Sequence, residues 1–226
     1  MSRNSRLGVF FALLATVIGL VVFTAMAWLR TNPATIDFRD GHQPGQPIHL
    51  TLQTVGAVGF GPHPTWVSYM TKAPNGVWVH TTLWTLPAHT KVDVTIMQFD
   101  SGSPLRNQQI GSIYGVDGQA AQINGKPVSL IDSNLGNGVG HTFSSPALGI
   151  NVPLPGVDGN AKNFCNVAAP CPLTALHNTV TFSFTTPGPG QYPWQCFVPC
   201  GLGFLYGNGG PMQTVGYMGG FFKVVS

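Results

Sequence analysis

A long apolar run lies near the amino terminus. From Leu7 to Leu29 the sequence has 23 residues without a charged side chain, and a helix of this length can cross about 30 Å of hydrocarbon. Arg3 and Arg6 precede the run, while the arginines that follow it are offset by aspartates. This charge distribution favours a cytoplasmic amino terminus. The pattern therefore predicts one transmembrane signal-anchor helix within residues 1–30, in the cell membrane, with the rest of the chain outside.

A cleaved signal peptide is the alternative interpretation of the same segment. Basic residues precede the apolar run, and Ala25-Met26-Ala27 matches the small-x-small pattern of a cleavage site. The run exceeds the usual apolar core of a signal peptide, about 7 to 15 residues, which favours the anchor. Cleavage near Ala27 would instead give a secreted protein, so both interpretations export the remainder.

Beyond this run the hydrophobic positions tend to alternate, and no stretch keeps a helical period. Turn-forming clusters separate short segments rich in β-branched and aromatic residues. The expected strands are 48–55, 76–84, 91–99, 127–132, 140–145, 178–186, 191–197 and 219–225. Eight strands at this spacing predict an all-β fold, a Greek-key β-sandwich of two sheets.

Three polar segments interrupt the strand pattern. Residues 31–46 contain Pro and Gly and are interpreted as a linker, which leaves 47–226 as one extracytoplasmic domain. Residues 101–126 and 146–177 are Gly/Pro-rich and are expected to form insertions of loop or short helix. Loops of this length in a compact domain are often functional.

The composition excludes several classes of function. Only 8% of the residues are charged, none is Glu, and the net charge of +3 is scattered along the chain. This charge is too small and too dispersed to predict a nucleic-acid partner. The sequence also lacks the G-x-S-x-G and H-E-x-x-H motifs of hydrolases and a phosphate-binding loop.

The four cysteines form two close pairs. Export to an oxidising compartment would allow either pair to close. No His or acidic residue close in sequence completes a metal site around Cys165 and Cys171, so we expect a disulfide there. Cys196 and Cys200 have a metal site and a second disulfide as alternatives.

Two segments in the second half of the chain carry recognisable motifs. The sequence GHTFSSPALGINVPLPG begins at position 140, and VTFSFTTPGPGQYPWQCFVPCG, which begins at position 180, contains a strand, a Pro-Gly turn and a Cys-x-x-x-Cys-Gly loop. In this order, the two segments resemble the first copper-ligand segment and the cysteine loop of the copper-binding domain of cytochrome c oxidase subunit II, within the cupredoxin superfamily. The resemblance covers residues 139–226 well and 47–100 weakly, and it implies a cupredoxin-like fold.

The resemblance also implies a set of copper ligands for one or two ions. His141 matches the first His, Cys196 and Cys200 match the thiolates that bridge two coppers, and Val198 matches a backbone carbonyl donor. Met218 matches the axial Met, with Met212 as the alternative. Thiolate, imidazole and thioether donors suit copper in electron transfer.

One expected ligand is missing. The family has a second His four residues after the second Cys, where this chain has Phe204, and no His follows His177. Copper could be held without a second His, His80 could supply the imidazole, or the site could be vestigial with a Cys196–Cys200 disulfide. Zinc is a further candidate, because Cys and His also bind it well.

The resulting functional hypothesis is electron transfer by a membrane-anchored cupredoxin. Its partners would be a redox protein or the other subunits of a terminal oxidase, and the chain would transfer electrons without catalysing substrate turnover itself. The alternative is a structural or assembly protein that keeps the sandwich but has lost redox copper. The tryptophans are assigned to packing rather than to an electron path; they are Trp66, Trp78, Trp84 and Trp194.

Asp100 directly follows the expected strand 91–99. It resembles a polar residue that often closes the strand ahead of the copper-ligand segment in cupredoxins, and we expect it to make a turn hydrogen bond.

Overall fold

The computed structural model describes residues 3–29, 33–201 and 210–226. The chain divides into two compact units, residues 1–31 and 32–226. The first contains helix α1, Arg3–Leu29. Its segment Ser5–Met26 has a mean hydropathy of 2.6, is long and apolar enough to cross a membrane, and is exposed at every described side chain.

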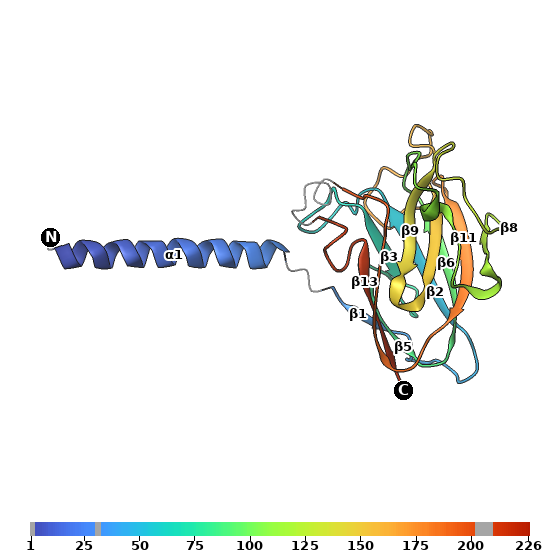
Figure 1. Ribbon diagram of the computed structural model, residues 1–226, viewed down its shortest axis with the longest axis horizontal. Helices are drawn as coiled ribbons and strands as arrows, with labels where there is room; N and C mark the ends of the chain where they lie inside the picture. Colours follow the sequence, from blue (N-terminus) through green and yellow to red (C-terminus); the bar gives the residue numbers. More distant parts are fainter. Residues whose placement is uncertain (1–2, 30–32, 202–209) are drawn as a thin grey trace. The chain divides into compact units, whose positions relative to one another are not determined.

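The second unit is a β-sandwich of two sheets (Figure 1). The strands of the first sheet, in spatial order, are β1 Thr35–Asp37, β5 Leu83–Pro87, β13 Gly219–Val225, β12 Gly190–Gln195, β9 Val139–Ser145 and β10 Ile150–Pro155. Those of the second are β4 Trp78–Val79, β3 Ser68–Lys72, β2 Ile48–Val55, β6 Lys91–Gln98, β11 Asn178–Thr185, β7 Ala121–Ile123 and β8 Lys126–Val128. Short 3-10 helices lie in the connections: η1 Gln108–Gly111, η2 Asp117–Gln119 and η3 Pro146–Leu148.

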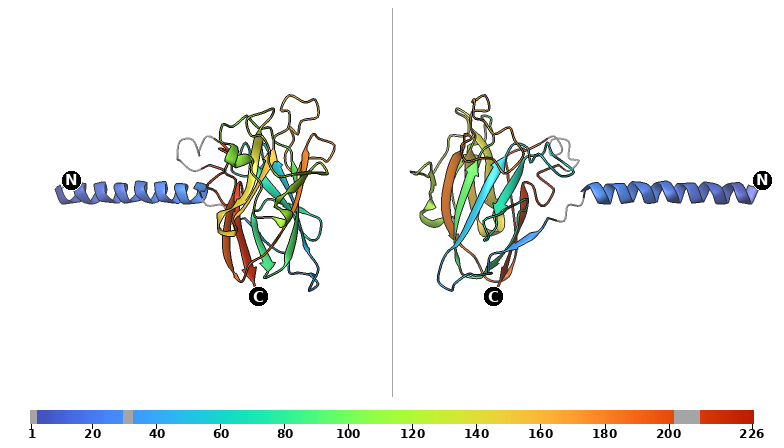
Figure 2. Two further views of the ribbon diagram at one scale, coloured as in Figure 1. Left: turned by 45° about the vertical axis from the view of Figure 1, so that its right-hand side comes forward. Right: turned by 180° about the vertical axis from the view of Figure 1, so that it is seen from behind.

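The chain crosses repeatedly between the two layers, which Figure 2 shows from two further sides. Strands β2 and β6 pair in parallel in one sheet, and β5 and β13 pair in parallel in the other. Such pairs require connections that leave the sheet and return. The all-β sandwich expected from the sequence, with an apolar helix before it, is confirmed.

Alternation explains why several strands form where they do. In β11 the side chains of Val180, Phe182 and Phe184 are buried, while those between them are partly exposed. A strand with this pattern buries one face against the opposite sheet and leaves the other face exposed to solvent. The same alternation made β6 and β11 recognisable in the sequence.

An aromatic cluster fills the space between the sheets. The rings of Trp84 and Trp194 stack at 4.8 Å between centroids, and Phe143 lies 5.0 Å from Trp194. Both indole N–H groups are satisfied, by Thr71 Oγ1 and by the carbonyl oxygen of Thr82. At 150–250 Å² and about 25 cal/mol per Å², each ring contributes about 4–6 kcal/mol of burial free energy.

The structure contains strands that the sequence analysis assigned to other elements. Strand β10 lies within the expected loop 146–177, and β1 lies within the segment 31–46 that was interpreted as a linker. Strand β10 carries Pro153 and Pro155 and occupies a sheet edge, where proline is tolerated because no further strand needs its missing N–H.

Other expected strands are divided or shorter. The expected strand 76–84 is divided between β4 and β5, and 127–132 is shortened to β8. Strand β3 was not expected, since its side chains are buried on both faces and show no alternation. Strand β7 lies within the expected loop 101–126.

Candidate metal centre

Two neighbouring strands bring the candidate ligands together. His141 lies near the start of β9, and Cys196 follows the last residue of β12. The strands are antiparallel neighbours, with Gln195 opposite Ser144. The beginning of β9 and the loop after β12 therefore meet at the same end of the sheet.

Three soft donor atoms converge at this end. His141 Nδ1 lies 3.1 Å from the Sγ of Cys200 and 3.8 Å from that of Cys196, and the two sulfurs are 3.4 Å apart. Each residue offers one ligand atom, and the three atoms lie within 4.8 Å of one another. All three side chains are buried, with exposed fractions of 5% or less. The folded chain thus assembles the His, Cys and Cys that were predicted from motifs far apart in sequence.

The carbonyl group predicted as a donor is also close. The oxygen of Val198 lies 3.0 Å from the Sγ of Cys200 and 3.6 Å from that of Cys196. Its role as a ligand stays a prediction.

The predicted methionine ligand lies beside the loop that carries the cysteines. Met218 immediately precedes β13, which pairs with β12, and its carbonyl oxygen accepts the N–H of Cys196 at 2.8 Å. The side chains of Met218 and Met212 are both buried in the hydrophobic cluster that includes the two cysteines. Either thioether as a ligand stays a prediction.

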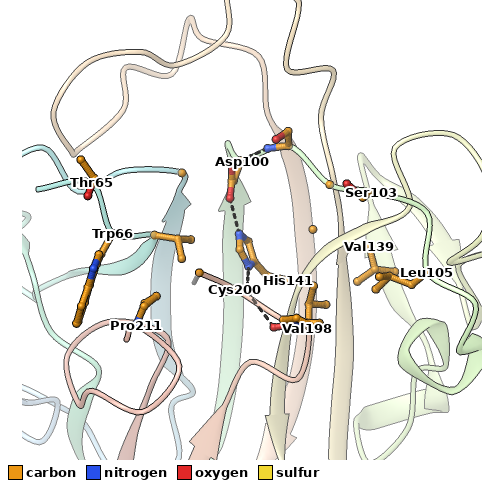
Figure 3. Close-up of a pocket in the computed structure, with 17 residues that line it drawn as sticks. Thr65, Trp66, Asp100, Ser103, Leu105, Val139, His141, Val198, Cys200 and Pro211 are labelled. Carbon is orange, nitrogen blue, oxygen red and sulfur yellow. Dashed lines mark hydrogen bonds and ion pairs between the residues drawn. The ribbon is translucent and has the colours of Figure 1, made fainter. Parts of the chain in front are cut away.

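An acidic residue that the sequence analysis assigned only to a turn contacts His141. Asp100 follows β6 of the opposite sheet, and its Oδ2 lies 2.9 Å from His141 Nε2. The expected turn hydrogen bond is present as well, from the N–H of Ser101 to Asp100 Oδ1 at 2.8 Å. Figure 3 shows the imidazole between the carboxylate and the Sγ of Cys200. The only signal in the sequence was an acidic residue directly after the expected strand 91–99.

Hydrogen bonds from β9 hold the cysteine loop. The N–H of Thr142 lies 3.4 Å from Cys196 Sγ, and its hydroxyl oxygen accepts the N–H of Phe197 at 2.8 Å. After the second cysteine, Gly201 has a φ of +93°, and a Cβ there would lie 2.8 Å from the ring of Pro211. A glycine therefore suits this position in the Cys-x-x-x-Cys-Gly motif.

The three candidate ligands shift one another's pKa values. Burial alone would lower the pKa of His141, but hydrogen bonds to Asp100 and Cys196 raise it to about 9. Burial opposes ionisation of Cys196, yet hydrogen bonds from Cys200 and His141 lower its pKa well below 9.0. The hydrogen bond to Cys196, together with burial, raises the pKa of Cys200. These contacts favour the thiolate form of Cys196, which is the form that binds metals.

Two further residues considered in the sequence analysis are not part of this cluster as described. His80 does not belong to the group of converging donors; its Nε2 lies 2.8 Å from Ser68 Oγ, and its ring packs against Tyr217. Phe204, which occupies the position of the family's second His, lies outside the described residues.

The two cysteine pairs differ in this structure. Cys165 and Cys171 form the expected disulfide. Cys196 and Cys200 are free, because 3.4 Å between their sulfurs far exceeds a disulfide bond of about 2.05 Å. The disulfide between Cys196 and Cys200, which was the alternative to a metal site, is therefore not formed in this structure.

A cavity of about 530 Å³ lies next to the donor cluster. Its lining includes Asp100, His141 and Cys200, with Trp66 and Leu105 on its walls (Figure 3). The candidate centre thus has open space beside it.

The comparisons with known proteins give structural resemblances only. No protein-family model and no curated protein sequence matches the chain. Rusticyanin from Thiobacillus ferrooxidans is 16% identical, with 87% of this chain and 85% of that chain covered and a TM-score of 0.32. A chain of a heme-copper terminal oxidase dimer is 14% identical, with 99% and 100% covered and a TM-score of 0.33. At these scores the two resemblances carry no conclusion about function.

The donor set itself indicates which metals fit. Two sulfurs and one imidazole are soft or intermediate ligands that suit copper, and also zinc, better than they suit magnesium or calcium. The described donors are therefore compatible with copper and define a candidate His/Cys/Cys metal site in a two-sheet β-sandwich.

Proposed function

We propose that this chain is a copper-binding electron-transfer protein. The observation that supports the proposal most is the convergence of His141 Nδ1 with the sulfurs of Cys196 and Cys200 within 4.8 Å. A bound copper ion would supply a one-electron redox centre. The chain contributes the donors, excludes water by burying them, and holds them on a rigid sandwich, which keeps reorganisation small.

The finer assignment follows the sequence resemblance to cytochrome c oxidase subunit II. In this proposal Cys196 and Cys200 are the thiolate ligands, Val198 gives a carbonyl oxygen, and Met218 gives a thioether. Helix α1 anchors the chain in the cell membrane with the sandwich outside. The partners are a redox protein or other oxidase subunits, and no substrate is turned over on this chain.

The test of copper binding uses the full-length protein in detergent. Copper is added under mildly reducing conditions and the visible spectrum is recorded after mild reoxidation. A thiolate site gives a strong charge-transfer band, which the substitution Cys196→Ser should abolish. As a matched control, Cys165→Ser with Cys171→Ser removes two sulfurs that are not among the converging donors and should leave the band.

Each alternative gives a different outcome. A colourless protein in which all four cysteines are disulfide-bonded would indicate the structural or assembly protein. Stoichiometric zinc without copper would indicate a zinc site. A copper band that survives in Cys196→Ser would refute the assignment of the ligands.

The anchor is tested separately. An uncleaved α1 keeps the protein in the membrane fraction after an alkaline carbonate wash, and the intact mass then includes the first residues. A soluble protein that begins after Ala27 would show that the apolar segment is a cleaved signal peptide.

A further inference from the structure

We propose that Asp100 is a positioning residue for the candidate metal centre, one that fixes His141 so that its Nδ1 faces the two sulfurs. This inference rests on the proposed function. It assigns a role to a residue that the sequence resemblance linked only to a turn.

The first step is the direction of the imidazole. Its Nε2 lies 2.9 Å from Asp100 Oδ2, and its Nδ1 lies 3.1 Å from Cys200 Sγ. An imidazole must be neutral to bind a metal, and a carboxylate accepts hydrogen bonds without donating them. In this neutral form of the ring, the contact with Asp100 places the proton on Nε2. The lone pair is then on Nδ1, on the side of the sulfurs. Without this acceptor, either nitrogen could carry the proton.

The second step is the way in which the carboxylate is held. Its other oxygen accepts the N–H of Ser101 at 2.8 Å. The backbone carbonyl of Asp100 accepts the side-chain N–H of Gln98 at 3.3 Å and the N–H of Val157 at 3.0 Å. Hydrogen bonds therefore hold both the carboxylate and the backbone carbonyl of Asp100.

The third step is the space that the chain leaves for this carboxylate. Gly56, directly after β2, lies against it, and a Cβ at that position would be only 2.6 Å from Asp100 Oδ1. The side chain of Asp100 is 18% exposed and that of His141 is 3% exposed. Little water can therefore compete for Nε2, and a carboxylate that orients a buried ring in this way typically raises metal affinity 10- to 100-fold.

The experiment measures the affinity of the full-length protein for Cu(I) by anaerobic competition with a chromophoric chelator. Asp100→Ala should weaken binding by about 10- to 100-fold. Asp100→Asn keeps an oxygen acceptor for Nε2–H and should recover part of this loss. Gly56→Ala leaves Asp100 in place but displaces its carboxylate, so it should weaken binding in the same direction.

Asp132→Ala is the matched control. Like Asp100, Asp132 accepts one backbone N–H and one side-chain N–H, from Asn134 and Gln108, but it contacts no candidate ligand. It should change the unfolding midpoint without changing copper affinity. The wavelength of the visible band after mild reoxidation, which a merely structural role would not move, should shift in Asp100→Ala and not in Asp132→Ala.

The outcomes separate the two proposals. Equal affinity and an unshifted band in wild type and Asp100→Ala would overturn the positioning role while leaving the copper site in place. If Asp100→Ala does not fold, an unchanged affinity in Gly56→Ala and Asp100→Asn would overturn it in the same way. Wild-type protein that takes up no copper would overturn the proposed function, and this inference with it.

Discussion

Replacement of Thr142 by valine tests whether β9 holds the cysteine loop in place. The hydroxyl oxygen of Thr142 accepts the N–H of Phe197, which lies between the two cysteines, at 2.8 Å. The residue is fully buried, and valine has nearly the same shape but no acceptor. Ser144 also points its hydroxyl at Thr142, but it has a shorter alternative, the Oδ1 of Asn151 at 2.6 Å. The loss therefore falls mainly on the N–H of Phe197.

The magnitude follows from the hydrogen bond and its surroundings. An intramolecular hydrogen bond contributes about 0.5–1.5 kcal/mol net. Phe197 is an exposed residue, so the full penalty for an unsatisfied buried group does not apply to its N–H. We expect Thr142→Val to lower the free energy of unfolding by about 0.5–1.5 kcal/mol. For a domain of this size, that corresponds to a decrease of about 1–6 °C in the unfolding midpoint. Copper affinity should decrease too, because Phe197 fixes the spacing of the cysteines.

The assay is thermal and urea unfolding of the full-length, metal-free protein in detergent, followed by tryptophan fluorescence. Thr181→Val is the matched control, since Thr181 lies half-buried on β11 and has no side-chain hydrogen bond among the described residues. It should stay within about 0.5 kcal/mol of wild type. If Thr142→Val also stays within that range and binds copper as wild type does, the anchoring role of Thr142 is refuted.

Three further substitutions test other parts of the site. Tyr69→Phe removes the hydrogen bond from the buried Tyr69 hydroxyl to the carbonyl oxygen of Thr142 and should cost about 1–3 kcal/mol in urea unfolding; no change would contradict a role for that bond. Met218→Leu should shift the visible band of the copper-loaded protein, while Met97→Leu on β6 should not; equal spectra would exclude Met218 as a ligand. Burial lowers the pKa of His80 below 6.5, so the unfolded chain takes up a proton there more readily, and stability should decrease as the pH is lowered below about 6.5. His80→Gln should flatten that decrease in unfolding measured from pH 8 to 5, and an unchanged slope would refute the explanation.

Strands that have one buried face and one solvent-exposed face were predicted well from the sequence. Strands β6 and β11 pair over their full length, and alternation marked both of them. Strands β3 and β10 are buried on both faces, so their side chains carry no alternation to recognise. The two prolines of β10 gave a second signal against a strand, which its place at the sheet edge explains.

The ligands were predictable for a different reason. His141, Cys196 and Cys200 belong to local motifs that resemble a known copper loop, so a match of residues was enough to propose them. Their convergence depends on the pairing of β9 with β12, which no local pattern encodes. The contact between Asp100 and His141 joins residues 41 positions apart on opposite sheets. A contact of this kind depends on how the two sheets pack against each other. The sequence therefore predicted the turn hydrogen bond of Asp100 but not its contact with His141.

The site therefore combines three independent parts of the fold. One sheet supplies the imidazole from β9 and the sulfurs from the loop after β12, while the other sheet supplies the carboxylate behind the ring. The backbone of Asp100 is held from its own sheet, since Gln98 at the end of β6 donates to the Asp100 carbonyl and also accepts the hydroxyl of Thr54 on β2. No single loop determines this geometry, because strands of both sheets must pack correctly to bring the three donor atoms within 4.8 Å of one another and the carboxylate behind the ring.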